Sequence, residues 1–475
     1  MKNGSRKPTL VEAVVAFVIP VLVVLYGTVI AKLPAIIPLL AAAVIASLFG
    51  IYFGYSWADL QKGVFDSIYR INVAIFILLL VGALIGVWIL AGTIPTIIYW
   101  GLKIISPSAF LVTSYLLCII ASVMTGSSFG TMGTVGIALL GIGQTLGYPL
   151  PLVVGAIVSG SYFGDKMSPT SSSTNIASSV CEVDLFTHIG SMMWTTIPAA
   201  VVSVIFYAFM GMHYSGIITA GNIPLILQTI KSTFNLSLWT LIPPIGLLIL
   251  AYRRFPAVPL IAVCTGAGAI LAWLLQGKTV LAIGNSMVAG YVGKSSLPAL
   301  DNLLNRGGIN STQGTIMLLI AAVTLGGILE TTKVLEVLVD ATLKWAKNTG
   351  RLIIAVLFAS YLMTIGTGSQ SVAMIIPGRA FASVFKERGL NMKVLSRTVE
   401  DGGCLATPLI PWSVHGFYIL GILGVSAWNY APYAIFNWIV PVFSIIYGYT
   451  GFAVWRADNT PLRKPPASVN NQRLN

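Results

Sequence analysis

The sequence predicts an all-α polytopic membrane protein with about 10–12 membrane segments. Hydrophobic residues make up 56% of the 475 residues and charged residues only 9%, and the mean hydropathy is +0.88. About a quarter of the residues of a soluble domain are charged, so this composition excludes that class. Apolar runs of about 20 residues, the length that crosses a bilayer core, recur along the chain, and polar, glycine-rich stretches interrupt several of them.

The basic residues predict how the chain is oriented in the membrane. The formal net charge is +13, but these residues lie mostly at the termini and in short connections, which favours topology over a nucleic-acid partner. Lys2, Arg6 and Lys7 place the N-terminus in the cytoplasm, and Arg456 and Arg463 place the C-terminus there too. We therefore expect a multi-pass protein of the cell membrane, a bacterial inner membrane, with an even number of crossings.

The first half of the chain, residues 1–212, contains interrupted as well as complete apolar runs. A glycine- and hydroxyl-rich stretch, 125–134, predicts a break, because such residues lower helix propensity. Two runs of half the spanning length, 135–142 and 151–158, lead into a polar stretch at 164–175. The other elements expected in this half are spans at 10–30, 33–53, 71–90, 110–124 and 192–210 and an interfacial helix at 93–106.

A connector, 213–237, leads to a second half, 238–455, in which the same order of events returns before a polar tail at 456–475. The break recurs at 366–371 and the polar stretch at 400–412. The remaining elements expected here are spans at 238–252, 256–275, 315–329, 352–364 and 434–453, short apolar runs at 280–291, 372–377 and 417–425, and an amphipathic surface helix at 333–347.

Two broken segments at corresponding places in two halves are typical of a transporter whose binding site lies near mid-membrane. A helix that breaks there exposes N–H and C=O groups that carry partial charges of about half a unit. Carbonyls, hydroxyls and a carboxylate suit a hard cation such as Na⁺, and helix N-termini suit a substrate carboxylate or phosphate.

The polar stretches supply the candidate ion ligands. Asp165 and Asp401 are carboxylates at expected membrane depth, a costly position that indicates function. The alternatives are a buried ion pair of Asp165 with its neighbour Lys166 and a helix cap at Asp401. With Na⁺ at Asp165, Asn175 and Asp401, the expected ion-binding residues are Asp165, Ser168, Ser172, Thr174, Asn175, Asp401 and Thr407.

Polar residues at the breaks are candidates for binding a substrate. His415 has a side chain that titrates near neutrality, which suits a proton carrier or a satisfied core histidine equally well. His188, His213 and Glu330 fall near predicted span ends and are expected at the interface. The expected substrate-binding residues are Thr125, Ser127, Ser128, Thr367, Ser369, Gln370, Ser413 and His415.

Three motifs carry a resemblance to a known family. They are Thr125–Thr131 with Gly143, Gly164–Pro169 with Thr174 and Asn175, and Leu395–Arg397 through Glu400 and Asp401 to Thr407–Trp412. Together they resemble the NhaC family of Na⁺/H⁺ antiporters, which includes malate/lactate exchangers and belongs to a broader ion transporter superfamily. The resemblance implies two inverted repeats with re-entrant hairpins, a Na⁺ site beside each unwound helix, and a homodimer with elevator-like motion.

Departures from the family pattern keep two functions open. The family carries an aspartate where this chain has Ser172, a tryptophan where it has Phe129, and Asn-Thr-Cys where it has Ser413-Val414-His415. The first hypothesis is Na⁺/H⁺ exchange by alternating access, with Na⁺ as coupling ion and no other cofactor. The second is Na⁺- or H⁺-coupled transport of a small organic acid or amino acid. The sequence contains no HExxH motif, so an enzyme is not expected, and the duplicated breaks favour a carrier over a channel.

Overall fold

A computed structural model describes residues 5–215, 223–253, 255–295, 297, 300–301 and 304–463. The described residues are mostly helical and form no β-strand, only two isolated β-bridges. Among them, seven helices are long and apolar enough to cross a membrane, or up to ten if each of three bent helix pairs counts as one span. The prediction of an all-α polytopic membrane protein with broken helices is therefore confirmed.

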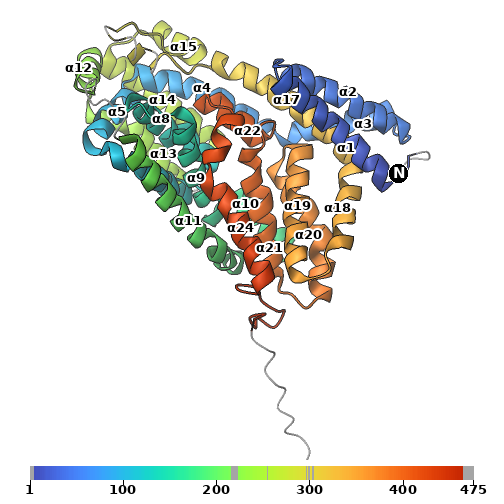
Figure 1. Ribbon diagram of the computed structural model, residues 1–475. Helices are drawn as coiled ribbons and strands as arrows, with labels where there is room; N and C mark the ends of the chain where they lie inside the picture. Colours follow the sequence, from blue (N-terminus) through green and yellow to red (C-terminus); the bar gives the residue numbers. More distant parts are fainter. Residues whose placement is uncertain are drawn as a thin grey trace, which may run out of the picture.

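The first helices follow the predicted spans closely. A capping box starts α1: the Thr9 hydroxyl accepts from the N–H of Glu12, whose carboxylate accepts from the N–H of Thr9. Figure 1 shows α1, α2 and α3 at one end of the molecule. These helices are α1 (Leu10–Leu25, extended by the π-helical turn Tyr26–Ile30), α2 (Ile36–Tyr52), α3 (Trp57–Arg70) and α4 (Asn72–Leu90).

The next segment contains two breaks, one at 126–127 and one at 168–171. The helical stretch between them includes a π-helical turn, Met132–Gly136. π-bulges of this kind occur frequently at functional sites. The helices are α5 (Thr93–Ile104), α6 (Phe110–Thr125), α7 (Ser128–Thr131), α8 (Ile137–Thr145), α9 (Leu150–Met167), α10 (Ser172–Val180) and α11 (Leu185–Ser215).

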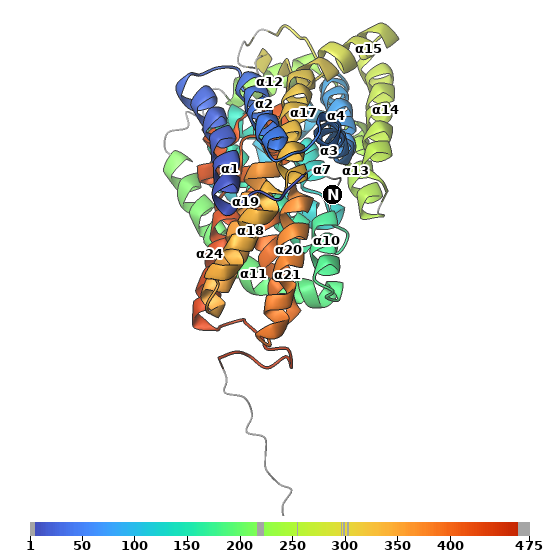
Figure 2. The ribbon, with the colours of Figure 1, turned by 90° about the vertical axis from the view of Figure 1, so that its right-hand side faces the viewer.

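The middle of the chain forms one edge of the molecule. Figure 2 shows α13, α14 and α15 together there, and α14 packs along α4. The helices are α12 (Ile223–Thr233), α13 (Ile242–Tyr252), α14 (Ala257–Gln276), α15 (Val280–Ala289) and α17 (Ile309–Thr331).

The last segment is a row of neighbouring helices, in which α18 packs on α19, α19 on α20 and α21, and α21 on α24 (Figure 1). A 3₁₀ turn, Thr407–Leu409, follows α21. The helices are α18 (Val334–Trp345), α19 (Thr349–Thr367), α20 (Gln370–Glu387), α21 (Met392–Ala406), α22 (Val414–Leu423), α23 (Ala427–Tyr430) and α24 (Ile435–Thr450).

The half-length runs predicted at 151–158 and 372–377 are wrong in length. α9 and α20 are each 18 residues long and continue through polar residues, including Asp165 and Lys166 in α9. The run at 135–142 also belongs to a longer unit, because helix resumes at Ser128, directly after the break. The polar stretches 164–175 and 400–412 therefore begin in the last turns of full helices and contain the turns that follow them.

The two segments predicted as surface or interfacial helices each pack an apolar face against other helices. α18 buries the apolar face that its sequence predicts, including Val334, Leu335 and Leu338, against α1 and α19. α5 buries most of its residues, among them Ile94 and Ile98, near α4 and α8. Packing against other helices accounts for both amphipathic patterns.

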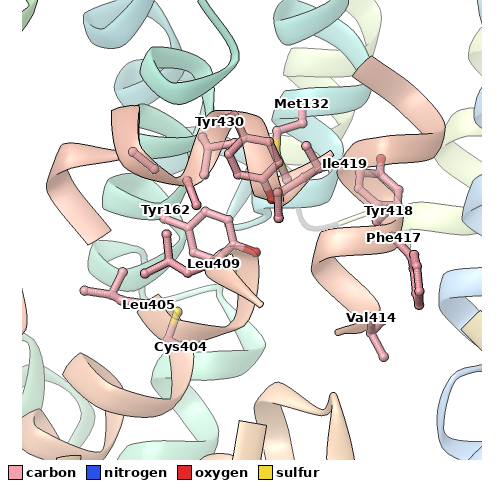
Figure 3. Packing of buried hydrophobic residues seen from close by; sticks show 14 of the residues in the cluster. Met132, Tyr162, Cys404, Leu405, Leu409, Val414, Phe417, Tyr418, Ile419 and Tyr430 are labelled. Carbon is pink, nitrogen blue, oxygen red and sulfur yellow. The ribbon is translucent and has the colours of Figure 1, made fainter. Parts of the chain in front are cut away.

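The two broken regions meet at a buried apolar contact. Tyr162 of α9 lies beside Cys404, Leu405 and Leu409 around the second break (Figure 3). Tyr430 belongs to the same cluster, and its hydroxyl donates to the carbonyl of Pro408, so this buried hydroxyl has a hydrogen-bond partner. This packing holds α9 against the end of α21.

Candidate ion-binding site

Each half contains the same sharp turn between two helices. Gly126 ends α6 with a left-handed φ of +63°, and the hydroxyl of Ser127 caps the next helix by accepting from the N–H of Gly130. Gly368 ends α19 with φ +65°, and Ser369 caps α20 in the same way. Glycine adopts this conformation without the steric cost of a Cβ atom, which explains the Thr-Gly-Ser sequence at both places.

Asp165 lies in the last turn of α9 inside a cage of serine hydroxyls. One carboxylate oxygen accepts from Ser128 at 2.7 Å and the other from Ser171 at 2.5 Å. Ser173 extends the cage, with its hydroxyl 2.9 Å from that of Ser171. Asp165 is buried, and it forms no ion pair with any residue that the structure describes.

Lys166 pairs with Asp401, not with its sequence neighbour. Both side chains of this ion pair are fully buried. Asp401 also accepts from Thr195 of α11 and from Ser444 of α24. The alternative in which Asp165 and Lys166 neutralise each other is therefore wrong, and Asp401 has a cation within the protein.

Glu400 forms a second buried pair beside it. One carboxylate oxygen lies 2.6 Å from Nε2 of His188, whose Nδ1 lies 2.8 Å from the hydroxyl of Ser396. The other oxygen accepts from Thr174 at 3.4 Å, and the same hydroxyl lies 3.0 Å from the carbonyl of Lys166. The expectation that His188 lies at an interface is wrong, since α11 carries it into the protein interior with no exposed surface.

His415 joins the two broken regions. Its Nδ1 forms a hydrogen bond with the hydroxyl of Tyr162, and its ring lies 4.4 Å from that of Phe129, centroid to centroid. Tyr418, in the same helix, donates to the carbonyl of Phe129 at 2.7 Å. α22 of the second half therefore packs directly on the first break.

The other predicted site residues mostly satisfy backbone groups at the breaks. Gln370 is an exception, since it donates to the sulfur of Cys404. The backbone contacts run from Ser168 to the carbonyl of Val123, Asn175 to Pro169 and Ser171, Thr367 to Met363, Thr407 to Gly403, and Ser413 to Thr407.

A cavity of about 420 Å³ opens beside the Asp165 cage. We call it the serine cavity. Ser127 and Ser172, which line it, are the sequence neighbours of the two serines that hold Asp165, and its opposite wall is apolar. Four of the predicted site residues, Thr125, Ser127, Ser172 and Asn175, line this cavity. The predicted site residues around the second break do not line it. Its polar lining residues are Thr125, Ser127, Thr134, Thr170, Ser172 and Asn175.

Several residues of the site were not predicted from the sequence. Ser171 and Ser173 are part of the hydroxyl run, but only the structure shows that Ser171 donates to Asp165 and contacts Ser173, while Ser172 lines the serine cavity. His188 lies 212 positions from its partner Glu400, so nothing local indicated the pair. The described residues contain no group of three or more His, Cys, Asp or Glu side chains that converge as metal ligands.

A multi-pass helical protein with matched helix breaks and buried carboxylates belongs to the class of secondary transporters. The model of the Na⁺/H⁺ antiporter family matches residues 160–452. The chain belongs to this family, whose members are transporters and not enzymes.

Relatives named for different antiport activities align over nearly the whole chain. A malate-2H⁺/Na⁺-lactate antiporter of Bacillus subtilis is 38% identical over 96% of this chain and 98% of its own. The Na⁺/H⁺ antiporter NhaC of Alkalihalophilus pseudofirmus is 39% identical over 89% and 92%. The arginine/ornithine antiporter ArcD of Halobacterium salinarum is 33% identical over 98% and 97%. The protein is accordingly a cation-coupled antiporter of the NhaC type.

Proposed function

We propose that the protein exchanges Na⁺ for H⁺ across the cell membrane by alternating access, with Asp165 as the exchange site. One observation carries the proposal. Of the three buried carboxylates, Asp401 is paired with Lys166 and Glu400 with His188, whereas Asp165 accepts from Ser128 and Ser171 and has no ion-pair partner among the described residues.

A lone buried carboxylate needs a positive charge, since an isolated anion is costly to hold away from water. A proton or a Na⁺ ion meets that need at Asp165, and each excludes the other. The hydroxyls of Ser128 and Ser171 suit both states, because a hydroxyl rotates to donate to a carboxylate or to turn an oxygen toward a cation. Competition of two ions for one site is the basis of exchange.

The remaining predicted ligands take supporting roles in this proposal. Asn175 lines the serine cavity and donates to the backbone carbonyl of Ser171, whose hydroxyl holds Asp165. Asp401 holds Lys166 in place beside the site through the buried ion pair. Thr174 links the two regions by its contacts with the carbonyl of Lys166 and with Glu400.

The wider arrangement follows from the same proposal. We place both termini in the cytoplasm of a bacterial cell and treat 1–212 and 238–455 as inverted repeats, each with its broken-helix motif, in a homodimer surrounded by lipid. The matching glycine turns at Gly126 and Gly368 support the repeat. The family resemblance supports the dimer and the elevator-like motion.

A second candidate function is exchange of a small organic acid or amino acid. The serine cavity, at about 420 Å³, is far larger than a dehydrated Na⁺ ion and has one hydroxyl-rich and one apolar wall. Relatives named for malate and lactate, or for arginine and ornithine, align along the whole chain. Uptake of radiolabelled lactate, malate and arginine into proteoliposomes tests this candidate, and indifference to all three contradicts it.

Proteoliposomes with an internal pH probe test the main proposal. Adding Na⁺ outside dequenches the probe in the wild type, and the signal is lost in Asp165→Asn, which keeps the shape of the side chain. Asp184→Asn is the matched control, because Asp184 is an exposed aspartate at the start of α11. A signal that survives in Asp165→Asn contradicts the assigned role.

A further inference from the structure

A second polar cavity lies at the other end of α9. It has a volume of about 470 Å³, and Leu150, the first residue of α9, lines it. Asp165 is 15 positions further along, which is roughly 22 Å at the rise of an α-helix. The cavity also contains Arg306, for which we call it the arginine cavity. It shares no lining residue with the serine cavity.

The backbone fixes Arg306 at this cavity. Gly307 and Gly308 follow it with φ of +84° and +83°, and the N–H of Gly308 donates to the carbonyl of Gly82 in α4 at 2.7 Å. A Cβ atom on Gly307 would lie 2.5 Å from the backbone nitrogen of Gly86. Only glycine permits this close approach, so the loop is docked on α4 and presents Arg306 in a defined position.

The guanidinium of Arg306 has a neutral partner. Its Nη2 donates to the side-chain oxygen of Gln144 at 2.5 Å, in a partly buried contact. Asp301, the nearest acidic residue in sequence, accepts instead from the backbone N–H of Ser295. No carboxylate of the described residues forms an ion pair with Arg306. The cavity thus contains a positive charge that the described protein does not neutralise.

Burial lowers the pKa of Arg306 from its ordinary value. That direction is expected for a cation removed from water without an anion beside it. The guanidinium nevertheless stays protonated in proteins, and it offers five N–H donors in a planar fork that matches a carboxylate. Most of these donors remain available beside the bond to Gln144.

The rest of the cavity wall is largely apolar, and several helices contribute to it. Ile85 of α4, Ile137 of α8, Leu150 of α9 and Leu423 of α22 all line it. Such a wall suits the hydrocarbon part of a small molecule, and the few polar groups set its orientation.

We propose that the arginine cavity binds the carboxylate of a small organic anion, with Arg306 as the cationic ligand and Gln144 as the residue that orients it. The site uses none of the residues that are proposed to bind Na⁺. It adds an anion-binding function to the proposed Na⁺/H⁺ exchanger. This anion site can be tested independently of the proposed exchange site at Asp165.

Thermal unfolding of the purified full-length protein tests the proposal in Na⁺-free choline salts at constant ionic strength. Choline lactate raises the melting temperature of the wild type relative to choline chloride, because a ligand that binds the folded state stabilises it. Lactamide, the uncharged counterpart, has no such effect. In Arg306→Gln the lactate concentration needed for the same shift rises at least tenfold. Equal stabilisation by lactamide, or none by lactate, overturns the proposal.

Two further variants keep the result interpretable. Arg306→Lys retains the charge without the fork and weakens lactate binding several-fold, which gives a readout if Arg306→Gln does not fold. Lys294→Gln removes an exposed charge from the same loop and responds to lactate like the wild type. Stabilisation of Arg306→Gln equal to that of the wild type overturns the site. Asp165→Asn loses stabilisation by Na⁺ but keeps that by lactate, so failure of either site is recognised separately.

Discussion

Lys166 of α9 and Asp401 of α21 form an ion pair in which both side chains are fully buried. α9 packs mainly along α6, whereas α21 packs along α19 and α20, so the pair joins the two halves of the chain. Thr195 of α11 and Ser444 of α24 donate to the same carboxylate. Four helices therefore converge on Asp401.

Removing one partner of this pair is expected to destabilise the protein strongly. Lys166→Met leaves the Asp401 carboxylate buried without a cation, which costs about 3–5 kcal/mol. The double variant Lys166→Met/Asp401→Asn removes both charges and recovers more than half of that loss. Melting temperatures in detergent measure both effects, and equal losses in the single and double variants contradict the account.

The first glycine turn is expected to tolerate no side chain. In Gly126→Ala the Cβ atom would lie 2.1 Å from the hydroxyl oxygen of Thr170, and φ is +63°. The left-handed conformation alone costs about 1–2 kcal/mol for a residue other than glycine. Gly190→Ala is the control, because a Cβ atom there meets nothing within 4 Å. Unchanged melting and transport in Gly126→Ala would show that the turn is adaptable.

Ser171 is expected to set the affinity for Na⁺. Ser171→Ala removes one of the two hydroxyls on Asp165, and losing a hydrogen-bonding group to a charged partner costs about 1.5–3 kcal/mol. The Na⁺ concentration for half-maximal exchange should therefore rise at least tenfold. Ser179→Ala, an exposed position in the same helix, serves as control. A larger effect at Ser172 than at Ser171 contradicts the proposed geometry.

Asp184 gives a prediction about pH. Hydrogen bonds from the backbone and side chain of Thr187 lower the pKa of Asp184. A carboxylate with a lowered folded-state pKa stabilises the protein above its unfolded-state pKa, near 4, and the contribution disappears as the pH falls through the folded-state value. Asp184→Ala should therefore melt below the wild type at pH 7, and the difference should shrink below about pH 4. A difference that stays constant across this range contradicts the capping role.

Much of the fold was predictable from apolar runs and glycine turns. The spans 10–30, 33–53 and 71–90 match α1, α2 and α4 within a few residues, because hydropathy alone identifies a long apolar helix. The predicted lengths of the half-length runs were wrong because polar residues within these helices interrupt their apolar pattern. Asp165 and Lys166 interrupt the apolar pattern of α9, yet their partners on other elements let the helix continue.

The site was predictable only in part. The hydroxyl run that includes Ser171 and Ser172 indicated a binding region. The register of α10, however, decides which serine contacts Asp165 and which lines the cavity. Pairs between distant residues, such as His188 with Glu400, depend on tertiary packing that no local pattern encodes. For the same reason the sequence did not show whether Lys166 belongs to Asp165 or to Asp401.

Equilibrium binding of ²²Na⁺ to the purified protein over a range of pH tests the central claim most directly. The account predicts saturable binding whose affinity falls as the proton concentration rises, since both ions compete for Asp165. It also predicts that Asp165→Asn loses this binding while Asp184→Asn keeps it. Binding of Na⁺ to Asp165→Asn with wild-type affinity, or an affinity independent of pH, would contradict the account.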